Sequence, residues 1–253
     1  VAPGGLSDIR AYALNRASRT LLQSLRVWPG EDAATPVSAM LICEDDAHSA
    51  PGAHKAHSGS AAAPQAALRF DAAGPASEPL AWIVDVPSLE QRLHNAVGYQ
   101  SGIEVFDSVD ALHTQAGSDM ASAADVALTV VCEGKRSSSR ALYGFEFDTQ
   151  PYPHTALATR LRCELPHGGV ARQWFVGGNI MAWLPLDGPR GHRVALVWSV
   201  THERAAQLLA LAPQDLADAV QAGGRAALGA LQVDGPAAAR SEEHTSELQS
   251  RHN

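Results

Sequence analysis

The chain has 253 residues, of which 45% are hydrophobic and 18% are charged. This is enough to bury a sizeable core, in one large domain or two modest ones. A net charge of -8 without any run of Lys or Arg excludes a phosphate backbone as partner, so we expect no nucleic-acid binding. No apolar run approaches the roughly 20 residues of a spanning helix. The three cysteines form no C-x-x-C pair, which favours the reducing cytoplasm.

Both ends of the chain are unusual. The first residue is Val1 and a helical pattern begins almost at once, so we expect that the opening strand of an α/β domain is missing, through either an alternative start codon or a truncated reading frame. The last residues, 240–253, include the run RSEEHTSELQS and resemble a translated sequencing adapter. We therefore interpret them as a non-native polar tail, leave them out of the fold prediction, and expect the natural protein to continue past Ala239.

The first half of the chain alternates between helical and strand patterns. Residues 8–28 carry apolar side chains at the helical period, with Ser7 or Asn15 as the possible cap. A second helix is predicted at 88–97 with Ser88 as its cap. Strands are predicted at 37–42, 67–70, 81–86 and 103–106, and the low-complexity stretch 47–66 predicts a flexible loop. The run VALTVVC, residues 126–132, is typical of a strand buried on both faces of a parallel sheet.

The second half predicts an antiparallel sheet followed by helices. Between residues 155 and 200, four strand-like runs are separated by short Gly, Pro and Asn turns. Thr201 can cap a helix that reaches residue 211, and Pro213 can open another. The sequence therefore predicts an α/β fold with a parallel-sheet domain at 1–150, the core of an antiparallel sheet at 151–201 and helices at 202–239.

One segment, residues 167–199 (HGGVARQWFVGGNIMAWLPLDGPRGHRVALVWS), carries a family resemblance. It resembles the flavin-dependent aromatic hydroxylases of ubiquinone biosynthesis, which are similar to para-hydroxybenzoate hydroxylase. In these, a histidine precedes an A-x-Q-[RW]-F strand, a small-residue turn, an A-x-L-P-L strand and a V-x-W-S strand. The matching residues are His167, Ala171, Gln173, Phe175, Ala182, Leu184, Pro185, Leu186, Val197, Trp198 and Ser199. The resemblance implies a partial Rossmann-like FAD-binding domain with an inserted antiparallel β-sheet substrate domain.

The resemblance also implies an activity. The complete enzyme would bind FAD, be reduced by NADH or NADPH, use dioxygen, and hydroxylate an aromatic ring of a ubiquinone precursor. A polyprenylated substrate would suit contact with the inner face of the membrane or a biosynthetic complex. Because the cofactor carries the chemistry, no catalytic side chain is assigned. Two alternatives stay open, namely a hydroxylase of another small aromatic substrate and a non-catalytic binding protein of the same fold.

Three residues are the candidate cofactor contacts. Arg10, in DIRAYAL, matches a D-x-R-x-x-A-[LI] pattern whose arginine reaches the flavin and its phosphates, for which a planar guanidinium is suited. Glu133 and Gly134 occupy the place of a D-G motif beside the cofactor ribose and phosphates, with Ser137 and Arg140 just beyond. Glu in place of Asp is a departure. A solvent-exposed arginine and an ordinary strand-to-loop turn are the alternatives.

Two further departures affect cofactor binding. Val86 stands where many relatives have Gln or Arg, and a valine side chain cannot hydrogen-bond a flavin. The G-x-G-x-x-G turn, which lets the backbone approach a pyrophosphate, does not occur in this sequence. We therefore expect the chain alone to retain FAD weakly or not at all.

The candidate substrate-pocket residues are Gln173, Phe175, Trp183 and Pro185. By resemblance, they lie on strands that face the flavin. Three are apolar, as suits a cavity that holds an aromatic ring and excludes water. For any one of them, a place in the core is an equally good interpretation.

A metal site is not predicted. His48, His54 and His57 lie near the acidic residues 44–46, but their spacing matches no zinc pattern, so a solvated loop is the better interpretation. Neither G-x-S-x-G nor a P-loop occurs.

Overall fold

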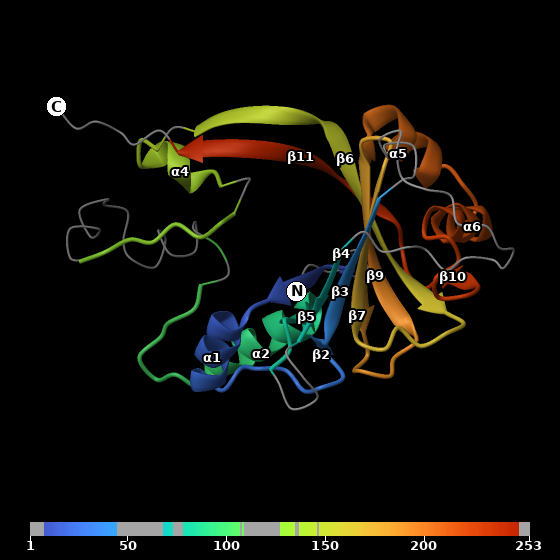
Figure 1. Ribbon diagram of the computed structural model, residues 1–253. Helices are drawn as coiled ribbons and strands as arrows, with labels where there is room; N and C mark the ends of the chain where they lie inside the picture. Colours follow the sequence, from blue (N-terminus) through green and yellow to red (C-terminus); the bar gives the residue numbers. More distant parts are fainter. Residues whose placement is uncertain are drawn as a thin grey trace, which may run out of the picture. The chain divides into compact units, whose positions relative to one another are not determined.

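The computed structural model describes residues 8–44, 68–72, 78–106, 108, 127–134, 137–145 and 147–247. They divide into two compact units, Val1–Ala96 with Tyr152–Glu242, and Val97–Pro151 with Glu243–Asn253. In chain order the elements are β1 (Ala11–Leu14), α1 (Arg16–Ser24), β2 (Ala34–Val37), β3 (Ala39–Glu44), β4 (Leu68–Asp71), β5 (Ala81–Asp85), α2 (Val86–Gly98), α4 (Ser139–Leu142), β6 (Phe147–Cys163), β7 (Val170–Val176), β8 (Asn179–Leu186), β9 (Arg193–Thr201), α5 (His202–Leu209), α6 (Pro213–Gly223), β10 (Leu231–Val233) and β11 (Ala238–Glu247) (Figure 1).

The first unit contains a large sheet with the strand order β10-β6-β9-β8-β7-β3-β4. The pairings along this order are antiparallel except that between β3 and β7, which is parallel. Gly177 and Gly178, both at positive φ, make the tight turn between β7 and β8. The four strands predicted between residues 155 and 200 are thus confirmed, together with their antiparallel arrangement.

Alternation along the strands gives the large sheet a helix-covered face, defined here as the face against α5 and α6 (Figure 1). Trp174 and Trp183 lie at its centre, with ring centroids 4.6 Å apart. The remaining core residues of this face and its helices include Cys43, Leu157, Leu161, Cys163, Met181, Val194, Leu196, Val200, Leu208, Leu216, Val220, Leu228 and Leu231. This cluster is the largest core of the first unit.

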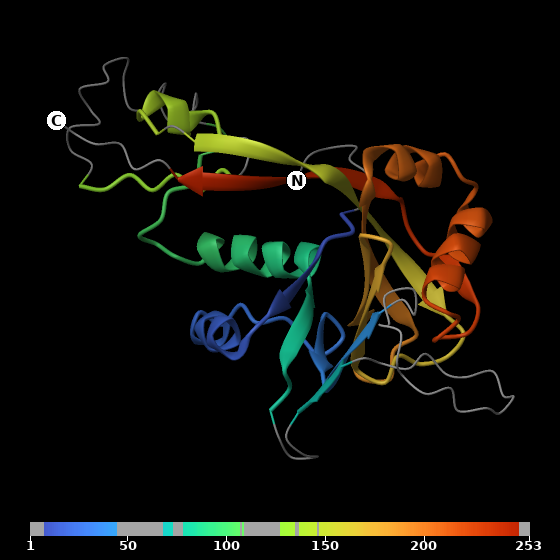
Figure 2. The ribbon, with the colours of Figure 1, turned by 45° about the horizontal axis from the view of Figure 1, so that its top comes forward.

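A small antiparallel sheet with the order β1-β5-β2 packs against the opposite face of the large sheet. Side chains of β5 alternate. Trp82 and Val84 face a core shared with Leu22 of α1 and Leu89 of α2, whereas Ile83 faces a core shared with the large sheet. In Figure 2, α2 continues directly from the end of β5. The two sheets therefore meet through every second residue of β5.

The α/β fold class predicted from the sequence is confirmed, with one parallel pairing, between β3 and β7, and antiparallel pairing in the small sheet. The predicted helix at 8–28 is correct only from Arg16, since residues 11–14 pair with β5 as strand β1. Asn15 is its N-cap, and its side chain accepts a hydrogen bond from the Ser18 amide. The predicted strand 37–42 is divided at Ser38, where the chain passes from the small sheet to the large one.

Helix starts were predicted with mixed success. Helix α2 begins at Val86, and its first-turn acceptor is Asp85, which takes the amide of Ser88 at 3.2 Å; the prediction that Ser88 is the cap was wrong. The Thr201 cap of α5 and Pro213 at the start of α6 are confirmed.

The strands predicted at 103–106 and 126–132 were wrong for the described residues, because 103–106 and 127–132 form no strand. Leu128 and Val130 are 77% and 69% exposed. A β-branched run without a partner strand has no ladder to join.

Residues 47–66 lie outside the described residues. Strand β11, Ala238–Glu247, pairs with β6. The interpretation of residues 240–253 as a non-native tail, the continuation of the natural protein past Ala239 and the domain boundaries stay predictions. Within the described ranges, the helices are too short or too polar to cross a bilayer.

Candidate functional site

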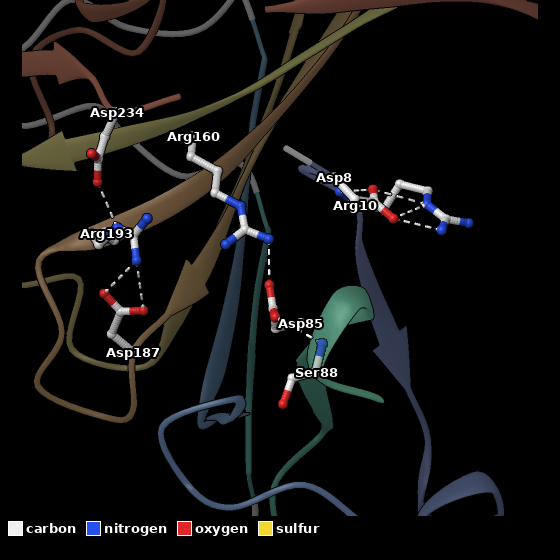
Figure 3. Close-up of polar contacts among 8 residues, drawn as sticks. All are labelled: Asp8, Arg10, Asp85, Ser88, Arg160, Asp187, Arg193 and Asp234. Carbon is white, nitrogen blue, oxygen red and sulfur yellow. Dashed lines mark hydrogen bonds and ion pairs between the residues drawn. The ribbon is translucent and has the colours of Figure 1, made fainter. Parts of the chain in front are cut away.

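Arg10 lies directly before β1, and two carboxylates hold its guanidinium. Nε and Nη2 donate to Asp8 Oδ2 at 2.9 and 2.6 Å (Figure 3), and Nη2 also donates to Glu90 Oε1 of α2 at 2.7 Å. The hydrogen bond with Asp8, more than that with Glu90, raises the pKa of Arg10 above its usual value. The planar fork is therefore fixed beside the start of α2, and an anionic ligand would have to compete with Asp8 for it.

Val86 adjoins Arg10. Its backbone N–H donates to the carbonyl oxygen of Arg10 at 3.2 Å. The valine side chain is buried, at 1% exposure, so it belongs to the core and does not reach a ligand. Two positions that the resemblance assigns to cofactor binding thus lie side by side, where α2 begins.

A polar cavity of about 250 Å³ lies between the small sheet and the large sheet. It is lined by Asp32, Ala33, Thr35, Ile83, Asp85, Ser88, Arg160, Leu186, Asp187 and Arg193. Arg160 Nη2 of β6 pairs with Asp85 Oδ1, while Asp85 Oδ2 accepts the amide of Ser88 (Figure 3). The side chains of Arg160 and Asp85 are 15% and 24% exposed. Asp85 thus joins a strand of the large sheet to the first turn of α2.

The turn between β8 and β9 lines the same cavity. The amide of Gly188 donates to Thr35 Oγ1 of β2 at 2.9 Å. Arg193 donates to Asp234 at 2.7 Å and lies 3.3 Å from Asp187, which adopts a positive φ of 62° (Figure 3). These contacts fix the turn against the small sheet.

Sequence reasoning missed the residues of this cavity. An aspartate just before a predicted helix is a common N-cap residue, so Asp85 could have been found. Arg160 gave no such signal, since its partner lies 75 residues away.

The four predicted pocket residues lie on opposite faces of the large sheet. Gln173 is paired with Ala182 and Phe175 with Ile180, whereas Trp183 is paired with Arg172. Because directly paired residues share a face, Gln173 and Phe175 lie opposite the helix-covered face. Trp183 is fully buried at 0% exposure in the core under α5 and α6, and Pro185, two residues on, shares its side.

Gln173 and Phe175 belong to what we call the open face, a set of half-exposed side chains on β7, β8 and β9. Its members are Gln173, Phe175, Ile180, Ala182, Val197 and Ser199, which the strand register places on one side. Phe175, Ile180 and Val197 are 36–39% exposed. The open face is therefore apolar, with one amide and one hydroxyl among its side chains.

The open face continues toward the edge of the sheet. Phe70 and Leu68 of β4 are paired with Met40 and Ile42 of β3, and Ile42 is in turn paired with Gln173. Phe70 and Leu68 are at least half exposed. Apolar surface thus extends across five strands.

Glu133 and Gly134 lie in the second unit. Glu133 accepts hydrogen bonds from Ser137 Oγ at 2.5 Å, Ser139 Oγ at 2.7 Å and the Ser139 amide at 3.1 Å. These bonds, chiefly that from Ser137, lower the pKa of Glu133. Gly134 has a positive φ of 74°, which suits glycine. The carboxylate is thus ordered by its own loop, and its role toward a cofactor stays a prediction.

The histidine-rich stretch falls outside the described ranges, including His48, His54 and His57. Where the structure describes the chain, no group of three or more His, Cys, Asp or Glu side chains is arranged to hold a metal ion.

Comparisons with known proteins find the same fold among flavin-dependent monooxygenases. No family model matches the chain. A mouse (Mus musculus) protein, the mitochondrial ubiquinone biosynthesis monooxygenase COQ6, is 29% identical over 128 residues, which are 49% of this chain and 26% of the mouse protein. PqsL of Pseudomonas aeruginosa superimposes with a TM-score of 0.58 at 12% identity, over 90% of this chain and 64% of PqsL. The flavin-dependent monooxygenase PieE, solved with FAD and substrate, gives 0.54 at 16% identity, over 96% and 45%.

The chain has the fold of flavin-dependent monooxygenases. It spans about a quarter of the length of the mouse relative and less than two thirds of PqsL. The sequence-predicted Arg10 and the open face lie on elements of this fold that the chain itself contains.

Proposed function

We propose that this chain is part of an FAD-dependent monooxygenase that hydroxylates an aromatic ring. The open face is the observation that carries the proposal. It presents half-exposed apolar side chains around the Gln173 amide, in a fold whose solved example PieE binds FAD and substrate. A soluble protein leaves such a surface exposed mainly where something binds.

The residues present fit FAD in part. Arg10 offers a fixed guanidinium next to the start of α2, which suits a phosphate group. Its donors are already shared with Asp8 and Glu90, and Val86 offers no side-chain hydrogen bond. The chain is therefore expected to lose FAD during purification but to bind it weakly when FAD is added in excess, and a stoichiometric yellow chromophore after purification would contradict this.

The side chains have distinct tasks in this proposal. Arg10 would bind the cofactor phosphates, and Glu133 with Gly134 would contact the ribose and phosphate region. Phe175, with the other apolar residues of the open face, would pack on the aromatic ring and exclude water, and the Gln173 amide would hydrogen-bond a ring substituent. When bound and reduced by NADH or NADPH, FAD supplies the reaction with dioxygen.

The proposed substrate is a ubiquinone precursor, in line with the mouse relative and the sequence resemblance. The apolar surface continues to Phe70 and Leu68, so it could contact a substrate that is larger than a single aromatic ring. A polyprenylated substrate would also bring the protein to the membrane surface or into a biosynthetic complex.

Two variants on opposite faces test the proposal. Ile180 lies on the open face and is 36% exposed. Val176 of β7 lies on the opposite face of the sheet and is 38% exposed. With FAD added in excess, a phenol such as 4-hydroxybenzoate is titrated while the flavin absorbance is followed. We expect Ile180→Ala to weaken phenol binding about tenfold, a loss of about 1.4 kcal/mol, and Val176→Ala to leave it unchanged. Equal binding in both variants contradicts the open face as the substrate site.

A further inference from the structure

We propose that Arg160 is a positioning residue, which acts through Asp85 to hold the start of α2 and the Arg10 backbone in place. The inference rests on the proposed function, because it concerns the side of the site that would bind FAD. Its starting observation is the ion pair between β6 of the large sheet and the end of β5 (Figure 3).

Arg160 belongs to the same side of the large sheet as the open face. It is paired with Ala195 of β9, and Ala158, two residues earlier on β6, is paired with Val197 of the open face. Residues two apart on a strand share a face. The guanidinium therefore lies on the strand face that would contact the substrate, at the end next to the small sheet.

Asp85 connects Arg160 to the two segments that hold Arg10, the first turn of α2 and the start of β1. One carboxylate oxygen receives Arg160, and the other accepts the Ser88 amide in the first turn of α2. Asp85 is also paired with Ala11 of β1, directly after Arg10, and the next residue, Val86, donates its amide to the Arg10 carbonyl. A shift of Asp85 would therefore move both segments that hold Arg10.

The ion pair between Arg160 and Asp85 is shielded from solvent, so breaking it is expected to have a measurable effect. The side chains of Arg160 and Asp85 are at least three quarters buried, and the Arg160 Nε is buried without a hydrogen-bond partner within the described part of the chain. The other arginine at this cavity, Arg193, is engaged with Asp187 and Asp234. Removing one member of such a pair leaves the other charge uncompensated.

The variants separate charge from helix capping. Asp85→Asn removes the charge but keeps an oxygen that can accept the Ser88 amide. Arg160→Gln removes the cation, and Arg160→Lys keeps the charge without the planar fork. Arg162→Gln is the matched control, two residues further along β6 with a side chain that is 62% exposed.

The measurement is the FAD dissociation constant of each full chain, from flavin fluorescence with FAD added in excess, beside urea unfolding without FAD. We expect Arg160→Gln and Asp85→Asn each to weaken FAD binding about tenfold or more, with the double variant no weaker than the worse single one. Arg160→Lys should recover part of the loss, and Arg162→Gln should stay within about twofold of the wild type.

Each outcome decides the inference. Wild-type FAD affinity in both Arg160→Gln and Asp85→Asn overturns it while the proposed function stands, as does an equal loss in Arg162→Gln. If Arg160→Gln does not fold, the isosteric Asp85→Asn answers the same question. A folded wild-type chain that binds no FAD at saturating concentration overturns the proposed function, and this inference with it.

Discussion

The two faces of the large sheet are made by alternating residues of the same strands, yet their side chains differ in how far they are buried. On the helix-covered face, Trp174 and Trp183 are buried almost completely under α5 and α6. On the open face, Phe175 and Ile180 keep more than a third of their surface exposed. The apolar side chains of the helix-covered face are buried and stabilise the fold, whereas those of the open face stay accessible to a ligand.

Truncating the buried tryptophan tests this contrast most severely. Trp183→Ala should lower the free energy of unfolding by about 3–5 kcal/mol, because it removes a fully buried ring and leaves a cavity beside Trp174. Urea unfolding of the purified chain measures the loss. A loss no greater than that of Phe175→Ala would show that the two faces do not differ as described.

Adding a single methyl group to the helix-covered face is the next largest test. A Cβ at Gly224 would overlap the Trp183 ring, so Gly224→Ala should cost about 1–3 kcal/mol. Gly98→Ala, at the end of α2, is the control because nothing lies within 4 Å of its added methyl group. Equal unfolding midpoints in urea for the two variants would contradict the tight packing.

A buried histidine ties the turn before β7 to the end of β8, and it makes stability depend on pH. The His167 Nδ1 accepts the Gly169 amide at 3.0 Å, so Nε2 carries the proton and donates to the Leu186 carbonyl at 2.7 Å. Burial, above all, lowers the pKa of His167 from its usual 6.5. Its contribution to stability is therefore complete above pH 6.5 and is lost as the pH falls below it.

Urea unfolding of wild type and His167→Gln at a series of pH values checks this sign. The variant should be less stable at neutral pH and should lose less stability on acidification. His94→Gln, which changes an exposed histidine of α2, should keep the wild-type profile. A wild-type profile that rises toward acid would contradict the buried neutral histidine.

The smallest effect on stability is expected on the open face. Phe175→Ala should cost about 1 kcal/mol or less, since much of the ring already contacts water. The same variant should weaken binding of 4-hydroxybenzoate in the presence of FAD about tenfold, a loss of about 1.4 kcal/mol. A large loss of stability without a loss of binding would show that Phe175 belongs to the core. It would contradict its assignment to the ligand-binding open face.

The sequence predicted the strands of the large sheet between residues 155 and 200 well, because their alternation is a local signal that is visible without knowing any partner. It missed β10, which lies in the stretch 202–239 predicted to be helical. The same alternation cannot tell which face will be covered, and so Trp183 and Phe175 were expected in one pocket although they lie on opposite sides. The pair of Arg160 and Asp85 joins residues 75 positions apart, which no local pattern reveals. The apolar run at 126–132 shows the converse, since strong β propensity did not make a strand.

The parallel pairing of β3 with β7 has a consequence for synthesis of the chain. Strand β3 is synthesised before β7, so the edge of β3 that pairs with β7 has no partner until α2, α4, β6 and β7 have been translated. During that interval an unpaired edge rich in Met, Leu and Ile is open to other nascent chains. Slow translation before residue 170 would therefore lengthen the time during which this edge can pair with another chain.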